Sequence, residues 1–496
     1  MNRKLKYVFP ISLIIIWASL IFFFSPISQI IITTPIHDDM PLTVIESSNN
    51  PTYTEKWNKT FGGIEEDIGY GVAIDADDYV YLVGSTKNYG TNTPSYSNAM
   101  LVKFDLNGNV IWYRTWGYDK TDIGYDVAVD NAHNVYIVGS TQNLPVSGRN
   151  LFVAKYDGNG NQLWNRTWGG MVSGDIEGYS VAIDKNNNIY ITGKVPGANI
   201  DMFVVKYNSS GTEIWNKTWG STGFDSGKGI AVDSQNDVYI VGTYYDTVSA
   251  NDLIFINKYS SDGTFQWTRK LGSNQYTDYG EGIAIDKNNN IYIVGSINNT
   301  GTSSYDIVVA KYDSLGNLIW EKYYGNSKKD YGYDIAIDGY NNIYISGSKE
   351  YYNPARNIYF MKIDSSGNIL FNTTWGGLVN SDMYGYAIAV SPGLDVYIGG
   401  AIPSGSNHIA ILIRYRYIKY VPIIAPGFQF YGLLISLDLI IIGIIIYRLI
   451  KSKSKNIKLF NWNAENISIN LHRNWQLFLK ESNYLLFFNF IILLWI

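Results

Sequence analysis

Residues 155–170 read KYDGNGNQLWNRTWGG, and this stretch decides the fold because similar stretches return along the whole chain. It begins as a strand that ends at Asp157, turns at Asn159-Gly160 and continues as a second strand that carries Trp164. Turn residues between two runs of aromatic and β-branched residues are typical of a β-hairpin. The pattern recurs at residues 103–117, 206–220, 258–272, 311–325 and 362–376, with a shorter WNKTFGG copy at 57–63.

One aromatic residue marks each copy of the pattern. The marks follow one another at intervals of roughly 52 residues, a period typical of solenoids, propellers or arrays. The marks are Trp57, Trp112, Trp164, Trp215, Trp267, Trp320 and Phe371.

The residue pattern within each repeat predicts four short strands. Between two marks, an Asp leads into an apolar run such as residues 181–184, a polar turn follows, and the next run resembles residues 190–193. A variable loop then leads back to the Lys-Tyr-Asp strand. Four antiparallel strands in a unit of this length describe a propeller blade, and the repeats lack the period of about 3.6 residues that a helix requires.

The two ends of the repeat region complement each other. Residues 53–60 form a lone outer strand, whereas residues 387–391, 396–399 and 408–415 supply three strands with no Trp strand after them. An open end would leave unpaired backbone groups at a sheet edge. We therefore predict an all-β, seven-bladed β-propeller of four-stranded antiparallel blades, in which the N-terminal strand completes the last blade.

The succession of Asp, IAID, NxYIxGS and KYDxxGxxxW resembles the SBBP-type (seven-bladed beta-propeller) repeat of prokaryotic surface proteins, over roughly residues 53–417. This resemblance implies extracellular display and binding, and no catalytic residue carries over from it. The Trp segment is also similar to the repeat with which quinoprotein dehydrogenases dock neighbouring blades. That similarity supports a docking role for the Trp residues and supplies no quinone site.

Composition limits the remaining possibilities. The chain has no cysteine, so no disulfide can stabilise it, and its net charge of −5 offers no basic stripe for nucleic acid.

The predicted segments are a signal anchor or signal peptide (1–33), a linker (34–50), the propeller (51–417), a connector (418–429), a transmembrane helix (430–450) and a basic then apolar cytoplasmic tail (451–496).

The charges beside the two apolar segments predict the topology. Arg3, Lys4 and Lys6 precede the first segment, and a basic cluster from Arg448 follows the second. Both basic ends should therefore stay cytoplasmic, which leaves the propeller outside the cell membrane. We expect one or two spans. Asp438, within the second span, is either a partner contact or a tolerated defect. Residues 484–496 are too short to cross and could lie in the interface, pair with the spans or belong to a truncated third helix.

An Asp before each innermost strand is the only candidate metal ligand set. Sevenfold geometry could gather these carboxylates into a ring that attracts a cation, or each could accept backbone hydrogen bonds in its own or the next blade. Gly227-Lys228-Gly229 lacks the Ser/Thr and the following helix of a phosphate loop. The Asp residues are Asp67, Asp122, Asp175, Asp225, Asp278, Asp330 and Asp382.

Glycosylation is a further possibility. Asn-x-Ser/Thr sequons mark possible sites on a surface protein, although an Asn- and Thr-rich repeat also generates them by chance and duplication. The sequons begin at Asn58, Asn165, Asn208, Asn216, Asn298 and Asn372.

The sequence contains few residues or motifs that indicate catalysis. The His residues are scattered, and the sequence contains neither a G-x-S-x-G elbow nor a cysteine nucleophile, so we name no catalytic residue and expect no cofactor. We predict a membrane-anchored, surface-displayed scaffold that binds a protein, a glycan or an envelope component through variable loops at 87–98, 142–150 and 244–251. The alternative is a membrane-anchored propeller enzyme, either polysaccharide-active or quinoprotein-like.

Overall fold

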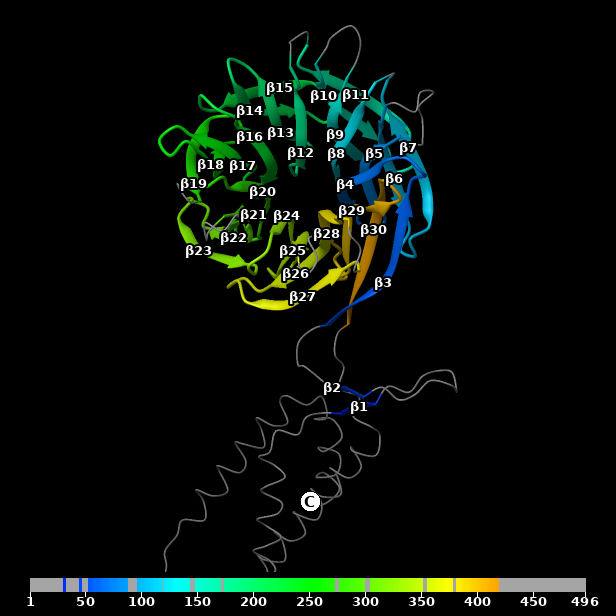
Figure 1. Cartoon of the computed structure of the whole chain (residues 1–496). Coiled ribbons are helices and arrows are strands. Elements are labelled where there is room, and N and C mark those ends of the chain that lie inside the picture. Colours follow the sequence, from blue (N-terminus) through cyan, green and yellow to red (C-terminus); the bar gives the residue numbers. More distant parts are fainter. Residues whose placement is uncertain are drawn as a thin grey trace, which may run out of the picture. The chain divides into compact units, whose positions relative to one another are not determined.

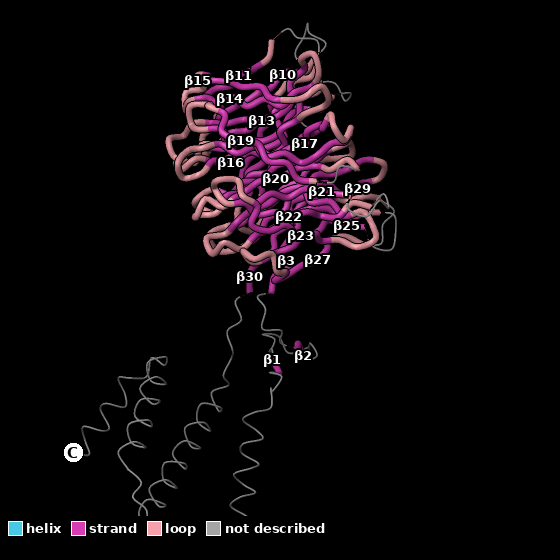
Figure 2. The backbone as a smooth tube through the Cα atoms, turned by 90° about the vertical axis from the view of Figure 1, so that its left-hand side faces the viewer, coloured by secondary structure: helices cyan, strands magenta, loops and turns pink. Residues whose placement is uncertain are grey.

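The computed structural model describes residues 30–32, 44–46 and 52–418, except 88–95, 119, 143–147, 171–173, 273–275, 299–303, 351–354 and 378–380. Seven four-stranded antiparallel sheets lie around a common centre as the blades of a propeller (Figure 1). Seen from the side, strands and short loops make up all of the described part (Figure 2). The predicted seven-bladed architecture is therefore confirmed.

The blades follow one another along the chain, and within each blade the strands run in order from the innermost to the outermost. Blade 1 contains β4 (Asp67–Ile74), β5 (Val80–Thr86), β6 (Asn98–Phe104) and β7 (Val110–Trp116). Blade 2 contains β8 (Asp122–Val129), β9 (Val135–Thr141), β10 (Asn150–Tyr156) and β11 (Gln162–Trp168). Blade 3 contains β12 (Glu177–Ile183), β13 (Ile189–Pro196), β14 (Ile200–Tyr207) and β15 (Glu213–Trp219).

The second half repeats this order. Blade 4 contains β16 (Ser226–Val232), β17 (Val238–Asp246), β18 (Asn251–Tyr259) and β19 (Phe265–Leu271). Blade 5 contains β20 (Tyr279–Ile285), β21 (Ile291–Ile297), β22 (Asp306–Tyr312) and β23 (Leu318–Tyr324). Blade 6 contains β24 (Asp330–Ile337), β25 (Ile343–Glu350), β26 (Arg356–Ile363) and β27 (Ile369–Trp375).

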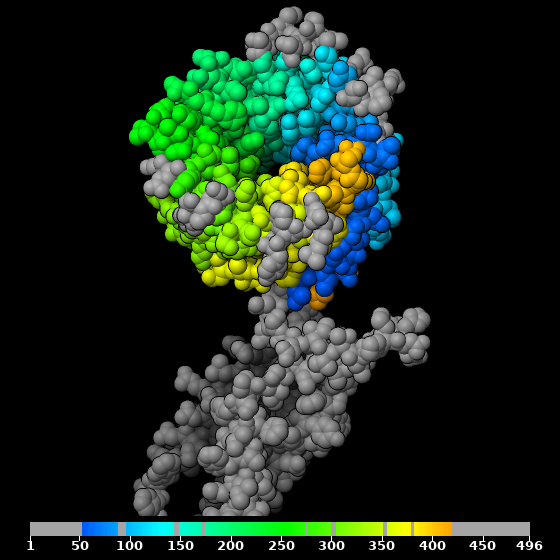
Figure 3. Space-filling view, viewed as in Figure 1, coloured from blue at the N-terminus to red at the C-terminus, as the bar shows by residue number. Residues whose placement is uncertain are grey.

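Blade 7 joins the two ends of the propeller. It contains β28 (Tyr384–Val390), β29 (Val396–Ser404), β30 (Asn407–Ile418) and, from the start of the chain, β3 (Thr52–Phe61). Antiparallel pairing of β3 with β30 runs from Thr52 opposite Ile418 to Phe61 opposite Ala410. The first and last segments of the propeller consequently lie side by side, blue against orange in Figure 3. The predicted closure by three strands plus one is confirmed.

Position within the blade determines the burial of each strand. The two middle strands lie between neighbouring blades on both faces, and every residue of β5 and β6 is buried. Such strands read as continuous apolar runs, as the YIVG segments do. The outermost strand β15 is exposed along most of its length. Clusters of buried side chains therefore form between adjacent blades, as where Tyr136 and Val138 of blade 2 pack with Ile191 and Phe203 of blade 3.

Glycine is required at two points of the repeat. A Cβ atom on Gly139, the glycine of the YIVGS strand, would lie 1.8 Å from the Ile123 carbonyl oxygen, so the first two strands of the blade approach closely at this point. Gly160 has a φ of 81° in the turn between β10 and β11, a conformation that glycine adopts without strain. Both glycines belong to the sequence pattern that predicted the blades.

The segments that flank the propeller are described only in part. β1 (Ile30–Ile32) and β2 (Val44–Glu46) pair antiparallel as a separate two-stranded sheet. The chain divides into two units after Tyr420, and residues 421–496 lie outside the described residues, as do both predicted apolar segments. No helix in the described ranges has the length and hydrophobicity needed to cross a membrane.

Candidate functional site

Much of the repeat pattern has a structural role, as blade 3 illustrates. Asp184 Oδ1 accepts a hydrogen bond from the backbone N–H of Asn188 at 2.8 Å, and Asp184 Oδ2 accepts one from the Tyr190 hydroxyl at 3.1 Å. Lys206 Nζ lies 4.9 Å from the centre of the Tyr190 ring and donates to the Ser261 carbonyl of blade 4 at 2.8 Å. These contacts close the turn and join two blades.

The aromatic marks lie against the turn of the next blade. Trp164 Nε1 donates to the Ser209 carbonyl at 3.2 Å, and its ring packs on Gly211, where an added Cβ would lie 3.1 Å from the indole. Trp57, Trp112, Trp215 and Trp320 donate to the next blade in the same way. The Trp267 ring packs on Gly316, and the Phe371 ring lies 5.4 Å from that of Tyr53.

The candidate carboxylate ring has local hydrogen-bond partners. Asp67 Oδ2 accepts from the Gly63 N–H at 2.8 Å, and Asp382 Oδ1 accepts from the Arg356 N–H at 2.8 Å. The other members also accept a backbone N–H. Among the described residues, no group of three or more His, Cys, Asp or Glu side chains is placed to hold a metal ion. These backbone hydrogen bonds are of the kind that the second interpretation expects, and Asp330 and Asp382 also form ion pairs with Lys349 and Arg356.

The sequon asparagines differ in their exposure. Asn58, Asn216 and Asn372 are exposed, Asn165 and Asn208 are half-buried, and Asn298 is only 6% exposed. Asn58 and Asn216 each donate a side-chain hydrogen bond to the Glu residue three positions earlier, Glu55 and Glu213. The exposed sites lie on the outer strands β3, β15 and β27, where a glycan would meet solvent.

The innermost strands carry a ring of side chains that the repeat pattern did not predict. Each of these strands has a register shift that leaves one residue unpaired, as between Gly124 and Asp126 in β8. The unpaired side chains are half-buried and contact one another from blade to blade: the Tyr125 ring lies 5.4 Å from Tyr70 and 5.2 Å from Tyr179. We call them the waist ring: Tyr70, Tyr125, Tyr179, Lys228, Glu281, Tyr333 and Tyr386.

Lys228 and Glu281 break the symmetry of the waist ring. Lys228 Nζ lies 3.9 Å from the centre of the Tyr179 ring, a cation–π contact. Burial raises the pKa of Glu281, and the charge of Lys228 partly opposes that rise. Burial also raises the pKa of Tyr70 to about 12, so its hydroxyl stays neutral at physiological pH. The tyrosines therefore offer neutral hydroxyl groups, whereas charge enters the ring only in blades 4 and 5.

Two half-buried carboxylates next to the waist ring join neighbouring blades. Asp126 Oδ2 accepts from the Val181 N–H at 2.9 Å, and Asp334 Oδ2 accepts from the Ile388 N–H at 2.8 Å. Burial raises the pKa of Asp126 to about 6 and that of Asp334 to about 7. The other blades have Gly, Ser or Ala at the equivalent positions, so these contacts occur at two blade junctions.

The edge of the propeller at which the innermost strands begin, which we call the entrance, is rich in tyrosine in blades 5 to 7. We call this group the tyrosine mouth: Tyr279, Tyr305, Tyr331, Tyr384 and Arg356. The Tyr305 ring lies 5.7 Å from Tyr279 and 5.3 Å from Tyr331. The Arg356 guanidinium lies 5.2 Å from the Tyr331 ring and 5.0 Å from the Tyr384 ring, and it is paired with the Asp382 carboxylate at 2.5 Å. Tyr279 remains 36% exposed.

The tyrosine mouth is continuous with the waist ring. Tyr331 lies 6.3 Å from Tyr333 with almost parallel rings, and Tyr384 lies 5.1 Å from Tyr386 in the same manner. Because a strand places alternate residues on one face, the residue two positions before each unpaired residue shares its direction. Aromatic contacts therefore extend from the entrance in blades 5 to 7 into the centre of the propeller.

A charged cluster lies on the other side of the entrance. Glu177 pairs with Arg149 at 2.8 Å and with Lys194 at 3.1 Å, and it accepts a hydrogen bond from the Tyr179 hydroxyl at 2.5 Å. Burial alone would raise the pKa of Glu177, but these partners outweigh it and leave the pKa below its ordinary value. Glu177 is therefore a fixed anion between two cations. With Asp175, whose Oδ1 accepts a hydrogen bond from the Arg149 N–H at 2.9 Å, the cluster holds two carboxylates and two cations.

The sequence held one signal for the waist ring. The position after the glycine of each innermost strand reads Tyr in five repeats but Lys228 and Glu281 in the other two. From the sequence, Lys228 stood out only within a segment that fails as a phosphate loop. Alternation alone does not predict which side chains face the centre, because the register shift inserts an extra residue in every innermost strand.

Comparisons with known proteins agree with this architecture. Residues 116–144, 170–194, 266–301 and 319–348 match the family described as SBBP, the beta-propeller repeat. An uncharacterized WD repeat-containing protein of Acanthamoeba polyphaga mimivirus is 24% identical and aligns with 59% of this chain and 31% of its own length. The regulatory protein FlaEY of Caulobacter vibrioides is 25% identical over 34% of this chain and 20% of its own length.

The chain thus spans less than a third of the length of either curated relative. Among solved structures, YCF48 bound to D1 peptide superposes with a TM-score of 0.44 at 12% identity, covering 74% of this chain and 96% of that one. Each of the four matched segments contains the innermost strand and all or most of the second strand of one blade, namely blades 2, 3, 5 and 6. The chain is therefore a seven-bladed β-propeller in which four segments match the SBBP beta-propeller repeat.

Proposed function

We propose that this protein is a binding protein, anchored in a membrane with its propeller outside, that captures a neutral glycan at the tyrosine mouth. The single observation that carries the proposal is the loss of sevenfold symmetry at the entrance. Structural contacts recur in nearly every blade, whereas among the described residues such tyrosine contacts at the entrance occur only in blades 5 to 7. A site that binds one ligand requires such unequal groups around it.

The chemistry of the mouth suits a sugar. Tyrosine presents a rigid apolar face with a polar hydroxyl at its edge, so the C–H face of a sugar ring can stack while its hydroxyl groups form hydrogen bonds. Tyr279 is exposed, and Tyr331 and Tyr384 are half-buried, so part of each ring is accessible. Tyrosine side chains also carry few rotatable bonds, which limits the entropy lost on binding.

The balance of charge favours a neutral ligand over a polyanion. Arg356 is paired with Asp382, and Arg149 and Lys194 are paired with Glu177. Lys228 belongs to the waist ring, deeper in the propeller, and its positive charge interacts with the Glu281 carboxyl group. A polyanionic glycan or a nucleic acid would require cations that are free to pair with it.

The predicted binding loop at residues 244–251 lies at the same edge as the mouth. Successive strands of a blade are antiparallel, so the loop after the second strand returns to the edge where the innermost strand begins. Residues 244–251 are described there and include Tyr244, whose ring lies 4.1 Å from Lys270 Nζ. Residues 88–95 and 143–147 of the other two loops lie outside the described residues.

Glycan binding is tested by titrating the full-length chain against a panel of neutral and acidic oligosaccharides. We expect neutral ligands to bind, and Tyr279→Ala to weaken binding about tenfold, because a stacked ring contributes roughly 1–1.5 kcal/mol. Tyr340→Ala is the matched control, since Tyr340 is 74% exposed in the turn between β24 and β25, at the opposite edge of the blade. Binding of acidic glycans alone, or equal binding by Tyr279→Ala, would contradict the proposal.

The membrane location is the second part of the proposal. Its support is the pair of apolar segments with basic flanks, residues 7–24 and 430–447, on either side of the propeller. The chain has no cysteine, so one introduced thiol can be labelled without background. We expect Tyr340→Cys in intact cells to react with a membrane-impermeant maleimide. Labelling only after the cells are lysed would place the propeller inside and remove this part of the proposal.

A further inference from the structure

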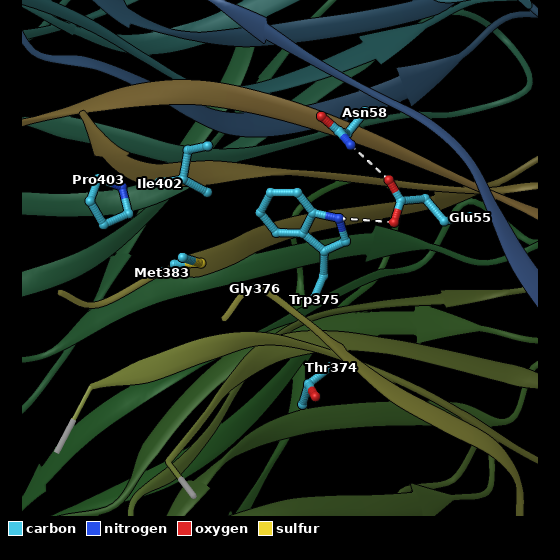
Figure 4. A pocket seen from close by; sticks show the side chains of 8 residues that line it. All are labelled: Glu55, Asn58, Thr374, Trp375, Gly376, Met383, Ile402 and Pro403. Carbon is cyan, nitrogen blue, oxygen red and sulfur yellow. Dashed lines mark hydrogen bonds between the residues drawn. The ribbon is translucent and has the colours of Figure 1, made fainter. Parts of the chain in front are cut away.

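A pocket lies at the junction of blades 6 and 7, where the two ends of the propeller meet. Its volume is about 480 Å³, and one wall is apolar, formed by Met383, Ile402 and Pro403. Trp375, at the end of β27, and Glu55, in the closing strand β3, lie next to each other among its lining residues (Figure 4). We call it the seam pocket. None of its lining residues belongs to the waist ring or the tyrosine mouth.

The Glu55 carboxylate is held in a fixed orientation. Its Oε1 accepts a hydrogen bond from Asn58 Nδ2 at 2.7 Å, and its Oε2 accepts one from Trp375 Nε1 at 3.0 Å, as the dashed lines in Figure 4 mark. A carboxylate can accept about four hydrogen bonds, so each oxygen keeps a free lone pair. Throughout the described ranges, no Lys, Arg or His side chain forms an ion pair with Glu55.

The aromatic stacking found at other junctions does not fill this space. Three tryptophans equivalent to Trp375 lie against a Phe of the next blade, with ring centres 3.9–4.9 Å apart: Trp116 on Phe152, Trp168 on Phe203 and Trp219 on Phe255. Those Phe residues pair with the strand glycine, as Phe152 pairs with Gly139. In blade 7, the residue opposite that glycine, Gly400, is Ile411. Ile411 is smaller than the Phe of the other blades and is not aromatic, so the Trp375 ring has no aromatic partner at this position.

We infer that the seam pocket binds an organic cation on an apolar stem, of the kind presented by a lysine or arginine side chain of a partner protein. The stem would lie along Met383, Ile402 and Pro403, while the cationic group pairs with Glu55. An anchored carboxylate binds a cation well, because little further entropy is lost when the ligand arrives.

The test uses the full-length chain and small probes that isolate the cationic group. Butylammonium represents lysine, butylguanidinium represents arginine, and butanol is the uncharged control, each titrated by ligand-observed NMR. We expect both cations to bind more tightly than butanol. Their relative affinities show whether the site prefers a lysine or an arginine. If butanol binds as tightly as both cations, the pocket is merely apolar and the inference is wrong.

Glu55→Gln separates charge from shape, since it keeps the size of the side chain and its Oε1 acceptor. We expect it to weaken binding of the cations about tenfold and to leave butanol unchanged. Glu213→Gln is the matched control, because Glu213 accepts from Asn216 Nδ2 at 2.6 Å in an outer strand, as Glu55 does from Asn58. Equal cation affinity in Glu55→Gln and the wild type overturns the inference. Glycan binding at the tyrosine mouth involves other residues and is measured separately.

Discussion

Replacing Tyr53 by Ala should detach the closing strand β3 from the last blade. The side chain is 4% exposed, and its ring contacts Tyr344, Phe360, Phe371 and Tyr417. Truncating a buried aromatic residue costs about 3–5 kcal/mol, of which most is lost packing. The contact with Tyr344 joins residues 291 positions apart, so its loss falls on the junction that closes the ring.

Tyr53→Phe divides that free energy into packing and hydrogen bonding. It removes only the hydroxyl, which lies 3.0 Å from the Tyr344 hydroxyl and 3.2 Å from Lys362 Nζ. Tyr344 keeps its hydrogen bond to Asp338, so we expect a loss of about 1–2 kcal/mol.

Urea denaturation followed by circular dichroism measures the free energy of unfolding of each variant. Lys56→Ala, an exposed position on the same strand, is the control and should change it by less than about 0.5 kcal/mol. The reasoning is refuted if Tyr53→Ala stays within about 1 kcal/mol of the wild type, or if Tyr53→Phe is equally destabilising.

Three other outcomes are expected. Trp164→Ala should lower the free energy of unfolding by about 3 kcal/mol in the same assay and Trp164→Phe by less, since Phe371 occupies the equivalent position; equal losses would argue against ring packing. Burial raises the pKa of Asp334 to about 7, above about 4 in an unfolded chain, so its contribution to stability is full below about pH 4 and is lost as the pH rises through 7. Asp334→Asn should therefore reduce the fall of the melting temperature with pH between about pH 5 and pH 8. If the melting temperature of the variant depends on pH as steeply as that of the wild type, this carboxyl does not titrate in that range. Because Asp67 and its equivalents accept backbone hydrogen bonds, neither EDTA nor added calcium should shift the melting temperature. A rise of the melting temperature with calcium would instead support the interpretation that these carboxylates form a ring that binds a cation.

The sequence was sufficient to predict the architecture because every blade repeats the same physical requirements. A turn glycine such as Gly160, a strand glycine such as Gly139 and a docking ring such as Trp164 recur at fixed intervals. Closure was predictable from the unmatched strands at the two ends. These features depend on local pattern, and local pattern is visible in the chain.

The sites were less predictable because they depend on contacts between distant residues. Glu55 and Trp375 are 320 positions apart and meet only because the ring closes, so neither suggests a pocket alone. The waist ring arises from a register shift in each innermost strand, which places Lys228 and Glu281 beside tyrosines. A single sequence shows the unusual residues but not which face of the strand carries them.

The pairing of Thr52 with Ile418 has a mechanical consequence. Both ends of the propeller leave from the same end of one antiparallel ladder, so tension applied through them would peel β3 from β30 one hydrogen bond after another. Resistance at any moment comes from a single residue pair rather than from the whole strand. Under load, the protein should therefore open first at this junction, while the other six sheets, each formed by continuous chain, remain paired.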